Sequence, residues 1–140
     1  MMKKIVLLVT LILCGAFVGA AQQKMHEPEK ESAVRKALMN AIRVYDVARN
    51  VELQGEIFKV SALQVQGNWA FASVERINLP EAAGGTHLAF LRKSGAGWKV
   101  MWSDYNDNQE IGVDALARLR QKHNDFKKEL ASFAESHLAG

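Results

Sequence analysis

The sequence predicts a single α+β domain, in which a long N-terminal helix packs on a four-stranded antiparallel meander (cystatin-like) and a long amphipathic helix follows. Three observations support this class. Apolar residues recur at helical spacing early in the chain, alternate along four short segments in the middle, and recur at helical spacing again near the end. With 140 residues, 49% of them hydrophobic, the chain suffices for one domain with its own core.

Residues 1–21 have the three zones of a secretory signal peptide. Two lysines give a positive start, residues 5–18 are almost wholly apolar, and residues 19–21 are small. The apolar run is shorter than the roughly 20 residues that a membrane span needs. We therefore expect cleavage after Ala21 or Ala20, a periplasmic or secreted product, and no membrane span after cleavage.

The only cysteine, Cys14, lies inside this signal. Leu13 before it is a poor match to a lipoprotein box, so we do not expect a lipoprotein. The mature chain then has no disulfide and no thiolate ligand. Removing Lys3 and Lys4 leaves 16 basic and 15 acidic residues, a net charge of +1. That charge is too small to predict nucleic-acid binding.

The N-terminal helix is expected from about Pro28 to Asn50. Residues 22–27 are polar and should form a flexible leader to the single domain at residues 28–140. Proline suits a first helical position, and acidic residues after it suit the positive end of the helix dipole. The apolar stripe consists of Val34, Ala37, Leu38, Ala41, Ile42, Tyr45 and Ala48.

The next two segments predict a hairpin. In the first strand, Phe58 and Val60 share one parity and Leu63 and Val65 share the other. Both pairs can face the same side only if the strand has a bulge near Ser61-Ala62. Residues 66–68 supply a tight turn. The second strand, residues 69–77, is apolar on both sides, so both faces of the sheet should be covered.

A second hairpin is expected from Thr86 to Lys93 and from Trp98 to Asp104. Pairing Lys93 with Trp98 across the glycine-containing turn places His87 opposite Asp104. The pairs between them are Leu91 with Val100 and Ala89 with Trp102.

The last segment, residues 112–137, predicts one long helix with a narrow apolar seam. Three uses of the seam remain open: packing on the sheet, forming a homodimer, and binding another envelope protein. The residues of this interaction helix are Leu119, His123, Phe126, Leu130 and Phe133.

Packing and turn residues of the two hairpins match a family pattern. They read Phe58-x-Val60-x-x-Leu63-x-Val65-x-Gly67-x-Trp69-Ala70-Phe71, then Leu91-Arg92-Lys93-x-Gly95-x-Gly97-Trp98-Lys99-Val100. The pattern resembles small exported bacterial proteins of the cystatin-like or nuclear-transport-factor-2-like type, which have no assigned activity. The resemblance covers about residues 32–102 and implies a helix lying in the cup of a curved sheet. Relatives with larger cups include isomerases, dehydratases and binding modules. The long final helix departs from this pattern.

His87, Asp104 and Tyr105 are the candidate catalytic residues. A carboxylate that orients an imidazole is the usual arrangement of a general base. Such a pair would serve a small cup-type isomerase or lyase. We favour the alternative, an ion pair at the strand ends, because nothing else in the sequence supplies a nucleophile or an oxyanion site.

Trp69, Trp98 and Trp102 are the candidate binding residues, since aromatic side chains are favoured where ligands bind. Their alternative use is in the core. We expect a non-catalytic module that binds a small apolar ligand or a protein rather than an enzyme.

No metal or cofactor is expected. Asp104, Asn106 and Asn108 match the first three ligand positions of a calcium loop. Gln109 replaces the required glycine, however, and Ala115 replaces the bidentate glutamate. The four histidines share no short spacing that would suit zinc.

Overall fold

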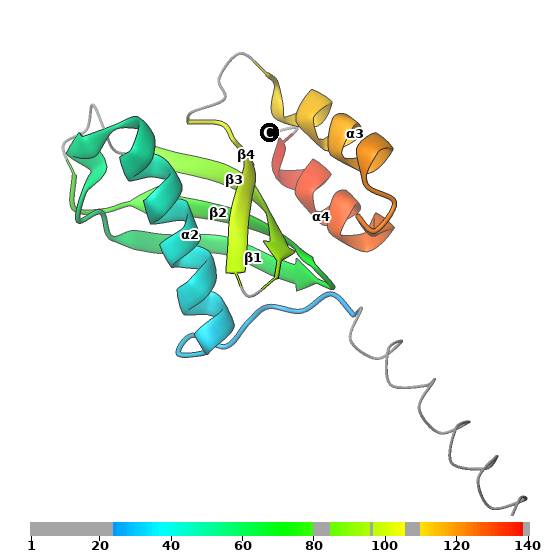
Figure 1. The fold of residues 1–140 in the computed structure, drawn as a ribbon, viewed down its shortest axis with the longest axis horizontal. Helices are drawn as coiled ribbons and strands as arrows, with labels where there is room; N and C mark the ends of the chain where they lie inside the picture. Colours follow the sequence, from blue (N-terminus) through cyan, green and yellow to red (C-terminus); the bar gives the residue numbers. More distant parts are fainter. Residues whose placement is uncertain (1–23, 80–84, 96, 106–109, 139–140) are drawn as a thin grey trace, which may run out of the picture.

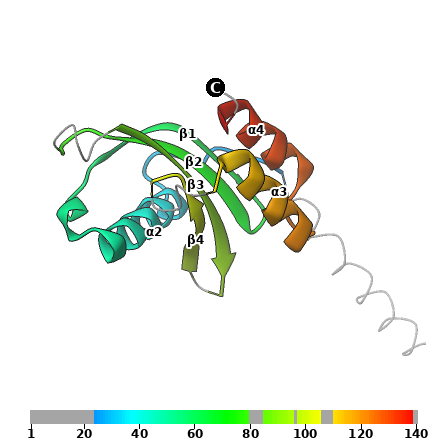
Figure 2. The same cartoon turned by 90° about the horizontal axis from the view of Figure 1, so that it is seen from above.

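A central antiparallel sheet lies between two helical layers in the computed structural model, which describes residues 24–79, 85–95, 97–105 and 110–138. Helix α2 (Ala33–Arg49) covers one face of the sheet. Helices α3 (Gly112–Lys122) and α4 (Lys128–Leu138) cover the other face (Figures 1 and 2). The α+β class and the coverage of both faces are as predicted. The expected signal peptide lies outside the described residues.

The sheet is a meander in which each strand pairs with the next along the chain. The predicted bulge in the first strand is present, because the pairing of β1 with β2 shifts between Val60 and Ala62. At the turn between these strands Gly67 has a φ of 60°, a conformation that glycine adopts without strain. The strands are β1 (Phe58–Gln66), β2 (Trp69–Arg76), β3 (Gly85–Ser94) and β4 (Gly97–Ser103).

A second bulge, which the sequence analysis missed, alters the hairpin of β3 and β4. The first pairs after the turn follow the predicted register, but the register then shifts next to Phe90. Trp102 therefore lies opposite Phe90 and not opposite Ala89, and Met101 is the extra residue. As a result Trp102 packs under α3 and α4, whereas Trp98 packs on the α2 face.

Helix α2 begins five residues later than predicted. The Ser32 hydroxyl accepts a hydrogen bond from the Arg35 backbone N–H at 3.2 Å, so Ser32 is the N-cap. Pro28 precedes the helix, and its carbonyl accepts a hydrogen bond from the Arg35 guanidinium at 3.0 Å. The helix starts at the serine and not at the proline because the serine side chain accepts a hydrogen bond from a free backbone N–H, which a proline side chain cannot do.

The part of the expected leader that the structure describes lies beside β1. His26 and Val65 exchange two backbone hydrogen bonds, with N–O distances of 2.9 and 2.8 Å. This bridge covers part of the outer edge of β1.

The final segment is two helices and not the single helix predicted over residues 112–137. The break falls at His123, whose backbone is extended with a φ of −132° and a ψ of 98°. Asn124 and Asp125 follow, and both residue types favour turns. A straight helix over this segment would be about 39 Å long, longer than the strands it covers. Breaking the helix lets both halves pack on one sheet face.

The apolar seam of this segment packs on the sheet of its own chain, which is the first of the three uses considered. Leu119, Phe126 and Leu130 are buried there. The partly buried side chains also contact aromatic rings, with centroid distances of 5.2 Å from His123 to Trp69 and 6.1 Å from Phe133 to Phe71.

Gln66 fixes α4 to the sheet, which makes it a test of this packing. Its side-chain oxygen accepts a hydrogen bond from the buried Leu130 N–H at 3.0 Å. Because Gln66→Leu leaves that N–H unpaired, we expect the free energy of unfolding in urea to fall by about 1–3 kcal/mol. Gln64→Leu, at a half-buried position of the same strand, is the control and should change it by less than about 0.5 kcal/mol. Equal effects of the two variants would contradict this role.

Candidate functional site

A buried cluster of charged residues joins α2 to one end of the sheet. The Arg76 guanidinium donates hydrogen bonds to Asp46 Oδ2 at 2.9 Å and to Glu56 Oε2 at 2.6 Å. All three side chains are at most 1% exposed. Because an unpaired charge at this depth would cost several kcal/mol, the three side chains depend on one another.

His87 extends this cluster. Its Nε2 atom lies 3.4 Å from Asp46 Oδ2, and its Nδ1 atom lies 3.3 Å from Ser103 Oγ and 3.7 Å from Asp104 Oδ1. The predicted register is wrong here, since the Asp104 N–H donates to the Leu88 carbonyl and Asp104 Oδ1 accepts from the Leu88 N–H. The side chains of His87 and Asp104 nevertheless come together.

Tyr105, the third catalytic candidate, lies against the same cluster. The Arg76 guanidinium carbon is 4.3 Å from the centre of its ring, and the Tyr105 hydroxyl accepts a hydrogen bond from Asn50 Nδ2 at 3.3 Å. Sequence analysis missed Asp46, Glu56 and Arg76. One signal was present, because Asp46 follows Ile42 by four residues and so lies on the apolar stripe of α2.

Burial and the neighbouring Asp46 together raise the pKa of Glu56 to about 7, against the opposing effect of Arg76. Glu56 Oε1 has no hydrogen-bond partner among the described residues. Asp46 raises this pKa because it can accept a hydrogen bond from Glu56 only when Glu56 is protonated. Burial also acts to raise the pKa of Asp46, but hydrogen bonds and charge from His87, with Glu56 and Arg76, hold it below its ordinary value.

The cluster is poorly placed for catalysis. His87 is only 2% exposed, and its ring is flanked by Phe58 and Tyr105 at centroid distances of 5.9 and 6.2 Å. Its imidazole could meet a substrate only after this packing opened. The arrangement is suited to holding α2, β2 and β3 together.

Glu56 should make stability fall as pH rises. Its pKa in the folded chain, about 7, exceeds the ordinary value of 4.5, so its contribution to stability is complete below about pH 4.5 and is lost as pH rises through about 7. We expect the melting temperature to fall more between about pH 5 and 8 in the wild type than in Glu56→Gln. Glutamine still accepts from Arg76 and donates to Asp46 at every pH.

The pH-dependent difference between these two proteins isolates Glu56 from other groups that titrate in the range. Glu52→Gln, at an exposed position, is the control and should leave the pH profile unchanged. Parallel profiles for wild type and Glu56→Gln would contradict the raised pKa of Glu56.

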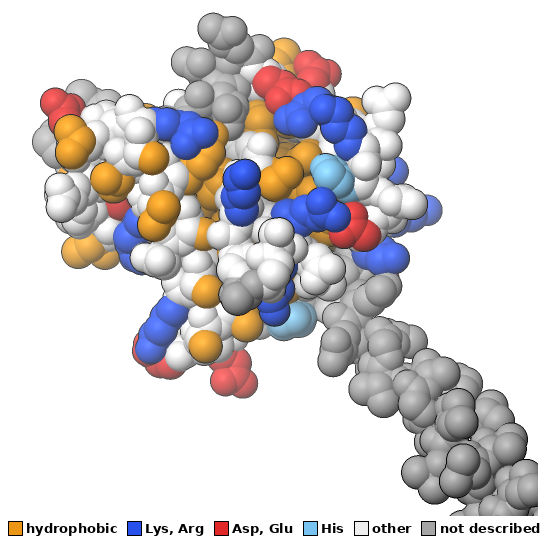
Figure 3. All heavy atoms as spheres, in the orientation of Figure 1, with side chains coloured by type: hydrophobic (Ala, Val, Ile, Leu, Met, Phe, Trp, Pro, Cys, Tyr) orange, Lys and Arg blue, Asp and Glu red, His pale blue; other side chains and the backbone are white. Residues whose placement is uncertain are grey.

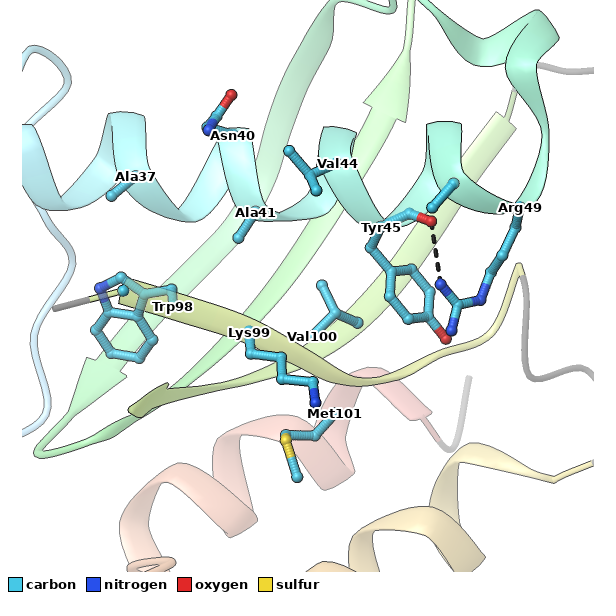
Figure 4. Close-up of a pocket in the computed structure, with 12 residues that line it drawn as sticks. Ala37, Asn40, Ala41, Val44, Tyr45, Arg49, Trp98, Lys99, Val100 and Met101 are labelled. Carbon is cyan, nitrogen blue, oxygen red and sulfur yellow. Dashed lines mark hydrogen bonds between the residues drawn. The ribbon is translucent and has the colours of Figure 1, made fainter. Parts of the chain in front are cut away.

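A groove of about 600 Å³ runs between α2 and the edge strand β4 (Figure 4). Its volume lies within the range of about 300–1,000 Å³ that small-molecule sites occupy. Small residues leave room for it, and apolar side chains appear among Lys and Arg on the face in Figure 3. The lining residues are Ala37, Asn40, Ala41, Val44, Tyr45, Ala48 and Arg49 from α2, and Gly97, Trp98, Lys99, Val100 and Met101 from β4.

The two ends of the groove differ in chemistry. Trp98 lies at one end, and Tyr45 and Arg49 lie at the other (Figure 4). The guanidinium carbon of Arg49 is 3.4 Å from the centre of the Tyr45 ring, and Arg49 donates a hydrogen bond to the Tyr45 carbonyl at 3.2 Å. The lining contains two cations, Arg49 and Lys99, and no acidic side chain.

The structure separates the three candidate tryptophans. Trp69 and Trp102 are 0% and 2% exposed in the core under α3 and α4, where Trp69 meets Phe126 at a centroid distance of 4.7 Å. Trp98 alone borders the groove, and it is partly exposed. The three residues therefore do not form one binding surface.

Comparison with known proteins gives no match to a family model, a curated protein or a solved structure. Within the described ranges, no helix is long and apolar enough to cross a membrane. The same ranges contain no group of three or more His, Cys, Asp or Glu side chains arranged for a metal ion. Asn106, Asn108 and Gln109 of the incomplete calcium motif lie outside them.

Proposed function

We propose that this chain is an exported, non-catalytic binding module whose site is the groove between α2 and β4. The groove carries the proposal, because it combines volume, an apolar lining and a few polar groups. Val44 in its wall is 63% exposed, although helices of a single domain usually turn valine inward. A bound apolar group would cover this side chain.

Export is proposed from the three zones of residues 1–21, with cleavage near Ala21 and release into the periplasm or beyond. The cystatin-like or nuclear-transport-factor-2-like resemblance is kept as a proposal. The packing of α2 across a four-stranded meander supports it, and α3 with α4 is an addition on the opposite face.

A small isomerase or lyase is the second candidate. The distance of 3.7 Å between His87 Nδ1 and Asp104 Oδ1 favours it. The burial of His87 and its contacts with Asp46 and Ser103 favour a structural role, which is the one we propose.

The neutral fluorescent dye N-phenyl-1-naphthylamine tests the groove. We expect the wild type to enhance the dye's fluorescence, and Val44→Asn to weaken binding about tenfold, because an amide replaces an apolar contact worth about 1.4 kcal/mol. Val113→Asn replaces an exposed valine on α3, across the sheet, and should bind as the wild type does. No enhancement by the wild type, or equal binding by both variants, would refute the site.

A further inference from the structure

We propose that the groove binds an extended peptide segment of a partner protein, which pairs with β4 as a fifth strand and carries acidic side chains between apolar ones. This inference rests on the proposed function, since it names the occupant of the same groove. Strand addition to an exposed sheet edge is a common mode of peptide recognition, in which main-chain hydrogen bonds give affinity and side-chain pockets give specificity.

The two edges of the sheet differ in how they are covered. Strand β1 lies at one edge, where His26 pairs with Val65 through both backbone groups. Strand β4 lies at the other edge, and within the described ranges no segment pairs with its outer side. The edge beside the groove is therefore the one that is open to a new strand.

The direction of the main chain on β3 shows which groups of β4 point outward. The Lys93 N–H donates to the Asn68 carbonyl at 2.7 Å, so the main chain of Lys93 faces β2. Because these groups alternate in direction along a strand, the main chain of Arg92 faces β4. Arg92 is paired with Lys99, whose main chain therefore faces β3.

By the same alternation, Trp98 and Val100 direct their N–H and C=O groups away from β3, toward the open edge. These two residues together offer two N–H and two C=O groups, and they lie two positions apart in the chain. An added antiparallel strand pairs with main-chain groups spaced in this way. The side chains of these two residues pack on the α2 face of the sheet. A strand bound here would thus lie along the groove.

The length of the groove suits a short extended segment. Its wall on α2 runs from Ala37 to Arg49, a distance of about 18 Å in a helix. Five or six residues of an extended strand cover about that distance. The bulge at Met101 ends the regular part of β4, so pairing is confined to the part of the strand that borders the groove.

Charge indicates the composition of the segment. The groove is bordered by Arg49 and Lys99, and the described residues show no ion pair for either. A lysine on an edge strand discourages pairing with neutral or basic strands. Acidic side chains in the bound strand would instead lie on the face of Lys99, which points away from α2, while the alternating apolar side chains meet the wall formed by Ala41 and Val44.

The test uses two capped peptides of about six residues, one alternating valine with glutamate and one alternating valine with lysine. Amide hydrogen exchange of the full protein is followed residue by residue by NMR. We expect the glutamate peptide to slow exchange at Trp98 and Val100 at least about tenfold, since their N–H groups become hydrogen-bonded. Lys99 is already paired with β3, so its exchange should not change.

The charge is tested with Lys99→Gln, which should weaken binding of the glutamate peptide several-fold. Lys128→Gln, on α4 and across the sheet, is the control and should bind as the wild type does. Equal binding of the lysine peptide would refute the acidic character of the segment.

The possible failures are distinguishable. If the dye binds in the groove but neither peptide slows exchange at Trp98 and Val100, the peptide inference is wrong and the proposed function stands. If neither the dye nor the peptides bind, both are wrong. Protection of these two amides that rises with protein concentration, without peptide, would identify a second copy of the chain as the occupant and overturn the inference.

Discussion

The burial of β2 on both of its faces is the constraint on which the architecture depends. Every residue of this strand except Glu75 is buried. Its large aromatic residues, Trp69 and Phe71, point toward α3 and α4, whereas Ala70 and Ala72 point toward α2. A strand of this kind needs cover on both sides, so the chain builds a helical layer on each. The alanines under α2 let this helix lie close to the sheet, and the edge strand β4 is left beside it.

The charged cluster fixes the position of α2 within this arrangement. Asp46 points inward to Arg76 and His87, while its neighbour Tyr45 lines the groove. The ion pairs that hold the C-terminal part of α2 on the sheet therefore also hold the end of the groove at which Tyr45 lies. Burying such a cluster is seldom the most stabilising solution, but it fixes one geometry, because each charge has its partners in only one arrangement.

Much of the fold could be predicted from the sequence wherever residues close together in the chain determine the structure. The parity change in β1 predicted its bulge, because side chains alternate strictly along a strand. The start of α2 differs from the predicted one because the Ser32 side chain caps the helix, and proline at position 28 has no side-chain acceptor with which to do so. The break at His123 was missed because the apolar spacing continues through it, and both helices use the same seam.

The sites were harder to predict than the fold. His87, Asp104 and Tyr105 were predicted from a strand register that is wrong by one residue. The side chains of His87 and Asp104 are nevertheless long enough to come together. Asp46 and Arg76 are 30 residues apart and form no motif. The groove owes its room to Ala37, Ala41, Ala48 and Gly97, small residues that carry no chemical signal in a sequence and matter only through the space they leave.

The bulge at Met101 gives the two halves of β4 different roles. Before it, Trp98 and Val100 turn their side chains toward α2 and leave the main-chain edge open beside the groove. After it, Trp102 is buried under α3 and α4, and Ser103 meets His87 within the cluster. An unbulged strand would keep Trp102 on the same face as Val100, where it would compete with α2 for space. One extra residue therefore allows a single edge strand to serve the core at one end and to border the groove at the other.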